Sequence, residues 1–271
     1  MRRDSRIVSW SPMTAKRWPT RKWIGSETWV DGTRIFARIA PGQTVDSPPI
    51  LMLHGLVVSS SYFRPVAHHL DERFSLYIPD LPGFGRSSAG AVRDLDGMID
   101  ALFAWMDVHG LESPVVMANS LGCQVASLLA TRHPERVSAL VMVAPTMDPS
   151  VSGPIGVTLR GLRDIPRERQ SLWRIWIPDF LLAGPVLALR WLMISLRDDQ
   201  LSRLPRIRQP VVAVAGERDP ICPVSWVRAF AGKVPRGRIE VIPGAPHAMN
   251  YSAPDALARI VADLVENGDG W

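Results

Sequence analysis

The sequence predicts an α/β protein: a mainly parallel, eight-stranded sheet flanked by helices, with an inserted helical cap. Short apolar, β-branched runs alternate with longer segments of helical spacing, which is typical of parallel strands joined by crossover helices. One interval of more than 60 residues, between about 143 and 211, contains no strand pattern. Because it interrupts an otherwise regular alternation, we expect this interval to be an insertion.

Eight apolar runs are the expected strands. The first two form a hairpin over residues 27–39, because Asp31-Gly32 favours a tight turn. The other six are the buried runs typical of parallel sheets, at 50–53, 74–78, 115–118, 139–143, 211–215 and 239–242. Helical spacing falls between the strands, at 62–70, 92–109, 121–133, 225–233 and 254–266.

The insertion is rich in Trp, Leu and Arg. Segments 161–174 and 186–196 have helical spacing, so we expect a cap of two to four helices. The longest apolar stretch, 180–196, is interrupted by Gly184 and Pro185 and is too short to span a bilayer. The chain then divides into a basic N-terminal segment, two parts of one core and the cap between them, with bounds 1–26, 27–145, 146–208 and 209–271.

The charge is concentrated at the N-terminus. The formal net charge is +5, but residues 1–22 hold seven basic residues and one acid, whereas the remaining 249 hold 24 basic and 25 acidic residues. A nearly neutral body without zinc-finger spacing argues against nucleic-acid binding. Trp10 and Trp18 among the basic residues allow weak contact with a membrane surface, although a tail packed on the body is the simpler expectation.

Cysteine usage points to a reducing compartment. Cys123 and Cys222 are too few for a disulfide framework and form no CxxC pair, so we expect reduced thiols and no metal site. The stretch after Arg2-Arg3 lacks the apolar region of a signal peptide. We therefore expect a cytoplasmic protein, and nothing in the sequence indicates an oligomeric state.

Ser120 is the expected nucleophile. Ligands bind at the carboxyl ends of strands in open α/β sheets, so reactive residues that follow strands are informative. The run 115–118 leads directly into Asn119-Ser120-Leu121-Gly122 and a helical segment, which matches a nucleophile elbow with Ala118 at the first small position.

A base and an orienting acid follow two other strands. Only His54 and His247, of six histidines, follow predicted strands, and His54 lies beside the expected oxyanion hole. His247 is therefore the expected base. Asp219 is the expected orienting carboxylate, with Glu217 and Asp148 as rivals, because it gives the chain order Ser, Asp, His.

Backbone N–H groups would form the oxyanion hole. Leu121 supplies one as the residue after the nucleophile, and Leu56, with Val57 as the fallback, supplies the other from the loop after the first parallel strand. The side chains expected in the substrate pocket are Val57, Asn119, Trp173 and Trp176.

Taken together, the motifs resemble those of the α/β-hydrolase superfamily over about residues 27–266. The matching segments are 53–55, 80–87, 118–122, 216–219 and 246–247, in the order of the family. The resemblance implies Ser120, Asp219 and His247 as a catalytic triad and the insertion as a lid over the site.

We expect a serine hydrolase that cleaves a small-molecule carboxylic ester of a fairly apolar substrate through an acyl-enzyme on Ser120, without a cofactor. The alternatives on the same residues are a carbon–carbon bond hydrolase of the ring-cleavage type, a lactonase and a thioesterase. A different class is a non-catalytic ligand-binding protein of this fold. The apolar cap residues would either line the pocket or hold the cap on the core.

Overall fold

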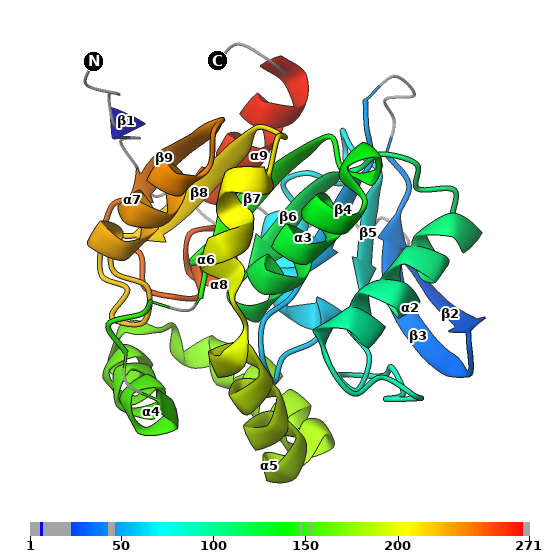
Figure 1. Ribbon diagram of the computed structural model, residues 1–271, viewed down its shortest axis with the longest axis horizontal. Helices are drawn as coiled ribbons and strands as arrows, with labels where there is room; N and C mark the ends of the chain where they lie inside the picture. Colours follow the sequence, from blue (N-terminus) through cyan, green and yellow to red (C-terminus); the bar gives the residue numbers. More distant parts are fainter. Residues whose placement is uncertain (1–5, 8–22, 43–46, 147, 152, 268–271) are drawn as a thin grey trace.

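A single twisted sheet forms the centre of the protein (Figure 1). The computed structural model describes residues 6–7, 23–42, 47–146, 148–151 and 153–267. Most of the basic N-terminal segment, expected to pack on the body with weak membrane contact as the alternative, lies outside these residues. The predicted α/β architecture is confirmed, with the strand order β1-β9-β8-β7-β6-β4-β5-β3-β2.

All eight predicted strands are present, and a two-residue strand adds to one edge. β2 and β3 form the predicted antiparallel hairpin, β3 also pairs antiparallel with β5, and every other pairing is parallel. The strands are β1 (Arg6–Ile7), β2 (Ile24–Val30), β3 (Thr33–Ala40), β4 (Ile50–Leu53), β5 (Leu76–Pro79), β6 (Val115–Asn119), β7 (Ala139–Val143), β8 (Val211–Gly216) and β9 (Gly237–Ile242).

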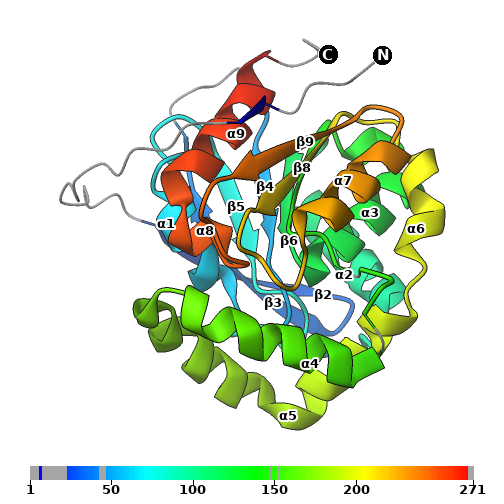
Figure 2. The same cartoon turned by 90° about the vertical axis from the view of Figure 1, so that its left-hand side faces the viewer.

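Helices cover both faces of the sheet, so the central strands β4, β6, β7 and β8 are buried along their whole length. Figure 2 shows α1, α8 and α9 on one face and α2, α3 and α7 on the other. These helices are α1 (Arg64–Ala67), α2 (Leu95–Val108), α3 (Leu121–Arg132), α7 (Val224–Lys233), α8 (Met249–Ser252) and α9 (Pro254–Asn267). Short 3-10 turns lie at Ser60–Phe63 (η1) and Pro134–Arg136 (η2).

The helix predicted over 62–70 is shorter than expected. α1 ends at Ala67, and the chain continues in tighter turns in which His69 N donates to Val66 O (3.1 Å) and Leu70 N to Ala67 O (3.0 Å). Bonds of this i to i+3 type replace the α-helical pattern.

The cap follows β7 and lies beyond the carboxyl ends of the strands (Figure 1). Its elements are α4 (Gly153–Asp164), η3 (Ile165–Arg167), η4 (Gln170–Leu172), α5 (Trp173–Arg197), α6 (Gln200–Arg203) and η5 (Leu204–Arg206). The prediction of one helix over 161–174 is wrong, because α4 ends before Pro166, which has no N–H to continue a helix. α5 itself is kinked at Gly184, whose φ is 74°.

A close approach of two backbones holds α3 against β4. A Cβ atom added to Gly122 would lie 2.2 Å from the carbonyl oxygen of Leu53 and 2.9 Å from that of His54. Neither oxygen can move without moving its strand end, so position 122 requires glycine. This contact fixes where the first turn of α3 meets the end of β4.

Gly122→Ala should lower the free energy of unfolding by about 2 to 3 kcal/mol, because the added methyl group forces the two backbones apart. Gly161→Ala in α4 is the matched control, since no atom lies within 4 Å of its added Cβ. That substitution should raise the free energy of unfolding by about 0.5 to 1 kcal/mol. Urea denaturation of the two variants measures both values, and equal stabilities would contradict the assigned clash.

Candidate active site

Ser120 lies on a strained turn between β6 and α3. Its φ is 55° and its ψ is −119°, a conformation that a non-glycine residue rarely adopts. Ser120 N donates to Val143 O (3.0 Å), and Ser120 O accepts from Cys123 N (2.9 Å), so the turn is fixed on both sides. The side chain is half-buried, as expected for a hydroxyl presented at the end of the sheet.

The predicted oxyanion-hole residues lie on two segments that meet beside Ser120. Leu121 is the first residue of α3, and the first N–H groups of a helix have no acceptor within it. Leu56 follows Gly55, whose added Cβ would lie 3.1 Å from the Cβ of Ser120. The loop after β4 therefore passes directly against the turn, and Val57 in this loop also has a positive φ, of 54°.

His247 is hydrogen-bonded to Asp219. His247 Nδ1 lies 2.8 Å from Asp219 Oδ2, and Asp219 Oδ1 accepts from the backbone N–H groups of Ile221 (2.7 Å) and Cys222 (2.9 Å). Asp219 is buried, so these bonds hold its carboxylate in one orientation. When Nδ1 donates to Asp219, the other ring nitrogen of His247 remains as a proton acceptor.

The two rival acids are engaged elsewhere. Glu217 Oε2 accepts from Gly244 N (2.7 Å), and Asp148 Oδ2 pairs with Arg160 Nη1 of α4 (2.7 Å). His54 is also engaged at both ring nitrogens: Nδ1 contacts Gly55 O (2.8 Å), and Nε2 accepts from Leu81 N (2.8 Å). Burial lowers the pKa of His54, so this residue is a neutral structural histidine.

The environment of His247 raises its pKa well above the usual 6.5. Burial by itself lowers the pKa, but the Asp219 carboxylate outweighs burial through its charge and its hydrogen bond. The protonated imidazolium is therefore the form that this site stabilises.

Hydrogen bonds across neighbouring strand ends connect the Asp219–His247 pair to the turn. Ser120 bonds to Val143 at the end of β7, and the next residue, Ala144, accepts from the thiol of Cys222 (3.3 Å). Cys222 Sγ, a carboxylate oxygen of Asp219 and a ring nitrogen of His247 lie within 4.8 Å of one another. Within the described part of the chain, Ser120 Oγ and His247 make no direct hydrogen bond; such bonds often shorten only when substrate binds.

The same three atoms have metal-ligand spacing, but their chemistry does not favour a metal. Both oxygens of Asp219 already accept hydrogen bonds. Burial raises the pKa of Cys222 to about 12, so its thiol keeps the proton that a metal would have to displace. Cys123 is also buried, and its thiol donates to Ala118 O (3.3 Å).

The residues predicted to form the substrate pocket have different surroundings. Trp176 stacks on Phe180 with ring centroids 5.0 Å apart and contacts an apolar cluster formed by Val58, Tyr62, Leu172 and Ala248. Trp173 meets Trp176 edge to face. Asn119 is buried and donates to Val143 O (3.2 Å), a structural bond between β6 and β7. Substrate contact by these residues, and by Val57, stays a prediction.

Two acids of the cap contact the loop that carries His247, and sequence reasoning missed both. Asp164 Oδ1 accepts from His247 N (3.4 Å), and Glu168 Oε1 accepts from Ala248 N (2.6 Å). No pattern distinguishes these acids from surface charges, since they lie four residues apart in an arginine-rich segment. Only the packing of the cap on the core brings them to the base.

Asp164 and Glu168 are hydrogen-bonded to each other. Two carboxyl groups can form a hydrogen bond only when one of them carries a proton, so a proton shared between them is the donor that joins them. Burial, reinforced by the charge of Asp164, raises the pKa of Glu168 from 4.5 to about 8. Burial also raises the pKa of Asp164.

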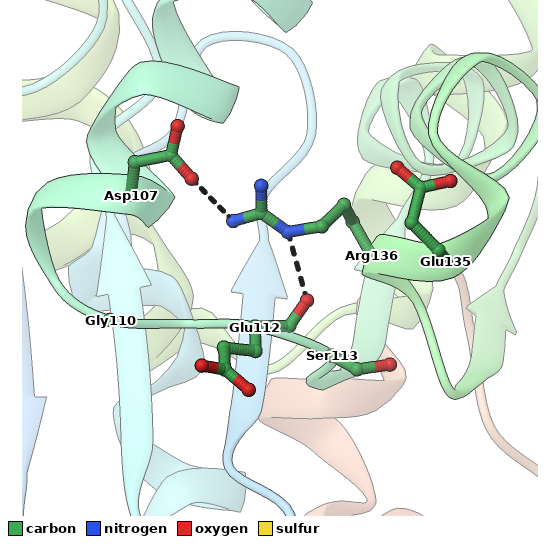
Figure 3. Close-up of a pocket in the computed structure, with 6 residues that line it drawn as sticks. All are labelled: Asp107, Gly110, Glu112, Ser113, Glu135 and Arg136. Carbon is green, nitrogen blue, oxygen red and sulfur yellow. Dashed lines mark hydrogen bonds and ion pairs between the residues drawn. The ribbon is translucent and has the colours of Figure 1, made fainter.

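A pocket of about 510 Å³ lies at the opposite ends of the strands (Figure 3). Its lining residues precede β6 or β7 in the chain and are Asp107, Gly110, Glu112, Ser113, Glu135 and Arg136. Arg136 already bonds to Asp107 (2.6 Å) and to Glu112 O (2.9 Å). Because sites in open α/β sheets form at the carboxyl ends of strands, this pocket is separate from the candidate active site.

Comparison with known proteins identifies the family. The model of the alpha/beta hydrolase family matches residues 50–260. The chain belongs to this family. It is 30% identical over 239 residues to the pimeloyl-[acyl-carrier protein] methyl ester esterase of Nitrosomonas europaea, covering 78% of this chain and 93% of that protein.

Two further proteins are similar to this alpha/beta hydrolase. The 2-hydroxy-6-oxo-6-phenylhexa-2,4-dienoate hydrolase of Burkholderia cepacia is 23% identical over 260 residues, covering 81% of this chain and 88% of that protein. A thermophilic esterase from Thermogutta terrifontis has the same fold, with a TM-score of 0.74, 21% identity and coverage of 91% and 99% of the two chains. The predicted superfamily and fold are confirmed, and the relatives support a hydrolase activity.

The pKa of His247 should fall when its partner loses its charge. We expect NMR titration of the imidazole to give a pKa above 6.5 in the wild-type hydrolase and a lower value in Asp219→Asn, because burial then acts without the opposing carboxylate. Glu217→Gln, which alters an acid that does not contact His247, should leave the titration unchanged. An unchanged pKa in Asp219→Asn would show that another group holds the proton.

The shared proton should make stability fall as the pH rises. Glu168 binds a proton in the folded hydrolase that the unfolded chain releases, so its contribution is complete below pH 4.5 and is lost as the pH rises to about 8. In Glu168→Gln, the amide can still accept from Ala248 N and can donate to Asp164. We expect this variant to have a flatter dependence of Tm on pH across this window.

Glu217→Gln is the matched control for this experiment, because Glu217 also accepts from a backbone N–H but is exposed. It should keep the wild-type dependence of Tm on pH. If Tm of Glu168→Gln depends on pH as strongly as Tm of the wild type, the shared proton is contradicted.

Proposed function

We propose that this chain is a serine hydrolase that cleaves the carboxylic ester of a fairly apolar small molecule through an acyl-enzyme on Ser120. The observation that supports it best is the 2.8 Å contact between His247 and Asp219 at the sheet edge where Ser120 lies on a left-handed turn. A nucleophile, a base and an orienting carboxylate then come from three strand ends in the chain order of this family.

In the first step the neutral form of His247 accepts the hydroxyl proton of Ser120 at Nε2, and Oγ attacks the ester carbonyl carbon. The carbonyl oxygen becomes an oxyanion that the N–H groups of Leu56 and Leu121 stabilise. The C–O bond then breaks, and His247 donates its proton to the leaving alcohol. The raised pKa of His247 supports this step, because Asp219 stabilises the imidazolium that forms.

In the second step water replaces the alcohol. His247 accepts a proton from water, hydroxide adds to the acyl carbon, and the same two N–H groups stabilise the second oxyanion. Collapse releases the carboxylic acid, and Ser120 regains its proton from His247. Apart from the water molecule and the ester, every group in these steps belongs to the chain.

An ester substrate is favoured over the alternatives by similarity. The relative named as a methyl ester esterase is 30% identical, whereas the relative named as a dienoate hydrolase is 23% identical. The second likeness keeps carbon–carbon bond hydrolysis as the competing candidate. The aromatic cluster of Trp173, Trp176 and Phe180 beside the His247 loop supports an apolar substrate.

Hydrolysis of p-nitrophenyl esters of increasing acyl length should show turnover with a chain-length optimum. Ser120→Ala should lower kcat/KM by at least about 10³-fold, because the acyl-enzyme cannot form. Asp219→Asn should lower it by about 10⁴-fold, because the imidazole loses its orientation and its charge partner. Initial rates over a range of substrate concentrations give kcat/KM for both variants.

Glu217→Gln is again the matched control and should keep wild-type rates. Loss of activity in this control, or full activity in Ser120→Ala, would contradict the assigned roles. If no ester is hydrolysed but 2-hydroxy-6-oxo-6-phenylhexa-2,4-dienoate is cleaved in a Ser120-dependent reaction, the carbon–carbon bond hydrolase replaces the esterase. Binding without turnover of either substrate would indicate a non-catalytic protein of this fold.

A further inference from the structure

The outer side of the cap is apolar. Among the described residues, 12 large hydrophobic side chains are exposed, and nine of them lie in α4, η3 and α5. The apolar cap residues were expected in the pocket or against the core, and the exposure of these nine shows that they are not buried against the core. We call this set the cap face; it consists of Ile155, Leu159, Leu162, Ile165, Ile177, Leu181, Leu182, Val186 and Leu189.

α4 is amphipathic in the reverse sense, and α5 has apolar side chains both against the core and exposed. Ile155, Leu159 and Leu162 are spaced at i, i+4 and i+7 along α4 and are exposed, whereas the acids Asp164 and Asp179 are buried. A surface helix of a globular protein normally buries its apolar stripe and exposes its charges. α4 and α5 lie side by side at the end of the molecule opposite the described termini (Figure 2), and both helices carry exposed apolar side chains.

Within the segment that carries the cap face the exposed charges have one sign, and the next exposed acid along the chain is Asp199, two residues beyond Arg197. Between residues 153 and 197, every exposed charged side chain is an arginine, at 163, 167, 169, 174, 190 and 197. The three acids of this segment, Asp164, Glu168 and Asp179, are turned into the protein and are buried or half-buried. A partner that complements this surface must be both apolar and anionic.

α5 lies on the protein surface rather than projecting from it. The helical stretch Gln170–Arg197 is long and apolar enough to cross a membrane by length and composition. However, it bends at Gly184 and is fixed to α3, because Gln124 Nε2 donates to Ser195 O (2.9 Å) and Ser195 Oγ donates to Gln124 Oε1 (2.5 Å). A helix held in this way can lie in a bilayer interface but does not span it.

We propose that the cap face docks on an anionic phospholipid bilayer. The exposed leucine and isoleucine side chains would enter the boundary between headgroups and acyl chains, and the six arginines would contact anionic headgroups. This surface differs from the basic N-terminal segment in residues 1–22. The proposal concerns binding alone, so it does not depend on the catalytic assignment.

Vesicle sedimentation of the full chain tests the proposal. We expect wild type to bind vesicles of phosphatidylcholine with phosphatidylglycerol more tightly than phosphatidylcholine alone. Leu181→Gln/Leu182→Gln/Val186→Gln should weaken binding about tenfold or more, because it removes apolar surface from the interface. Arg169→Gln/Arg174→Gln/Arg197→Gln should weaken binding to the anionic vesicles selectively and reduce its dependence on salt.

The three exposed hydrophobic residues outside the cap provide a matched control. Ile24→Gln/Trp29→Gln/Val108→Gln alters side chains of similar exposure on β2 and α2 and should leave binding unchanged. Equal thermal unfolding midpoints among the variants show that loss of binding is not loss of folding. A second control, Lys16→Gln/Arg17→Gln/Arg21→Gln/Lys22→Gln, separates the cap from the N-terminal segment.

Four outcomes would overturn the proposal. The first is that both cap variants bind vesicles as tightly as the wild-type protein does, or that the wild-type protein binds none. The second is loss of binding only in the N-terminal variant, which would place membrane contact in residues 1–22.

The third is that the wild-type protein forms a dimer without lipid in sedimentation velocity and that the variant with Leu181→Gln is a monomer, since the cap face would then bind a second copy. The fourth is arginine-dependent binding of acyl carrier protein, a small acidic protein, by a chain that does not bind vesicles.

Discussion

The candidate site depends on one close approach, between the first turn of α3 and the carboxyl end of β4. Glycine at position 122 lets the helix backbone approach the Leu53 carbonyl, and glycine at position 55 lets the next loop approach Ser120. With both backbones at this separation, Ser120 adopts a left-handed conformation and its hydroxyl lies at the end of the sheet. The loop that carries Leu56 and the first turn of α3, which begins at Leu121, meet beside Ser120 for the same reason.

The polar half of the site is built on the neighbouring strand ends. Asp219 and His247 follow β8 and β9, which are adjacent parallel strands, so their side chains meet without a long connecting loop. Backbone N–H groups orient Asp219, and Asp219 in turn sets the tautomer and the charge preference of His247. Burial strengthens this electrostatic control, because little water is present to screen it.

Much of this arrangement could be predicted from the sequence because it depends on local patterns. Buried strands are apolar runs, and Ser120, Asp219 and His247 each directly follow such a run. The break before Pro166 and the contacts of Asp164 and Glu168 could not be predicted, because they depend on how the cap packs on the core. The outward direction of Leu181 and Leu182 could not be predicted either, since helical periodicity identifies an apolar stripe but not what it faces.

The contacts of Asp164 and Glu168 link the position of the cap to the position of the catalytic base proposed here, His247. Both carboxyl groups bond to the backbone of the loop that holds His247, at His247 N and Ala248 N. A displacement of residues 164–168 away from the core breaks these bonds and the support of that loop together. Motion of the cap and loosening of the base are therefore coupled, so any state in which residues 164–168 leave the core also has a less ordered His247 loop.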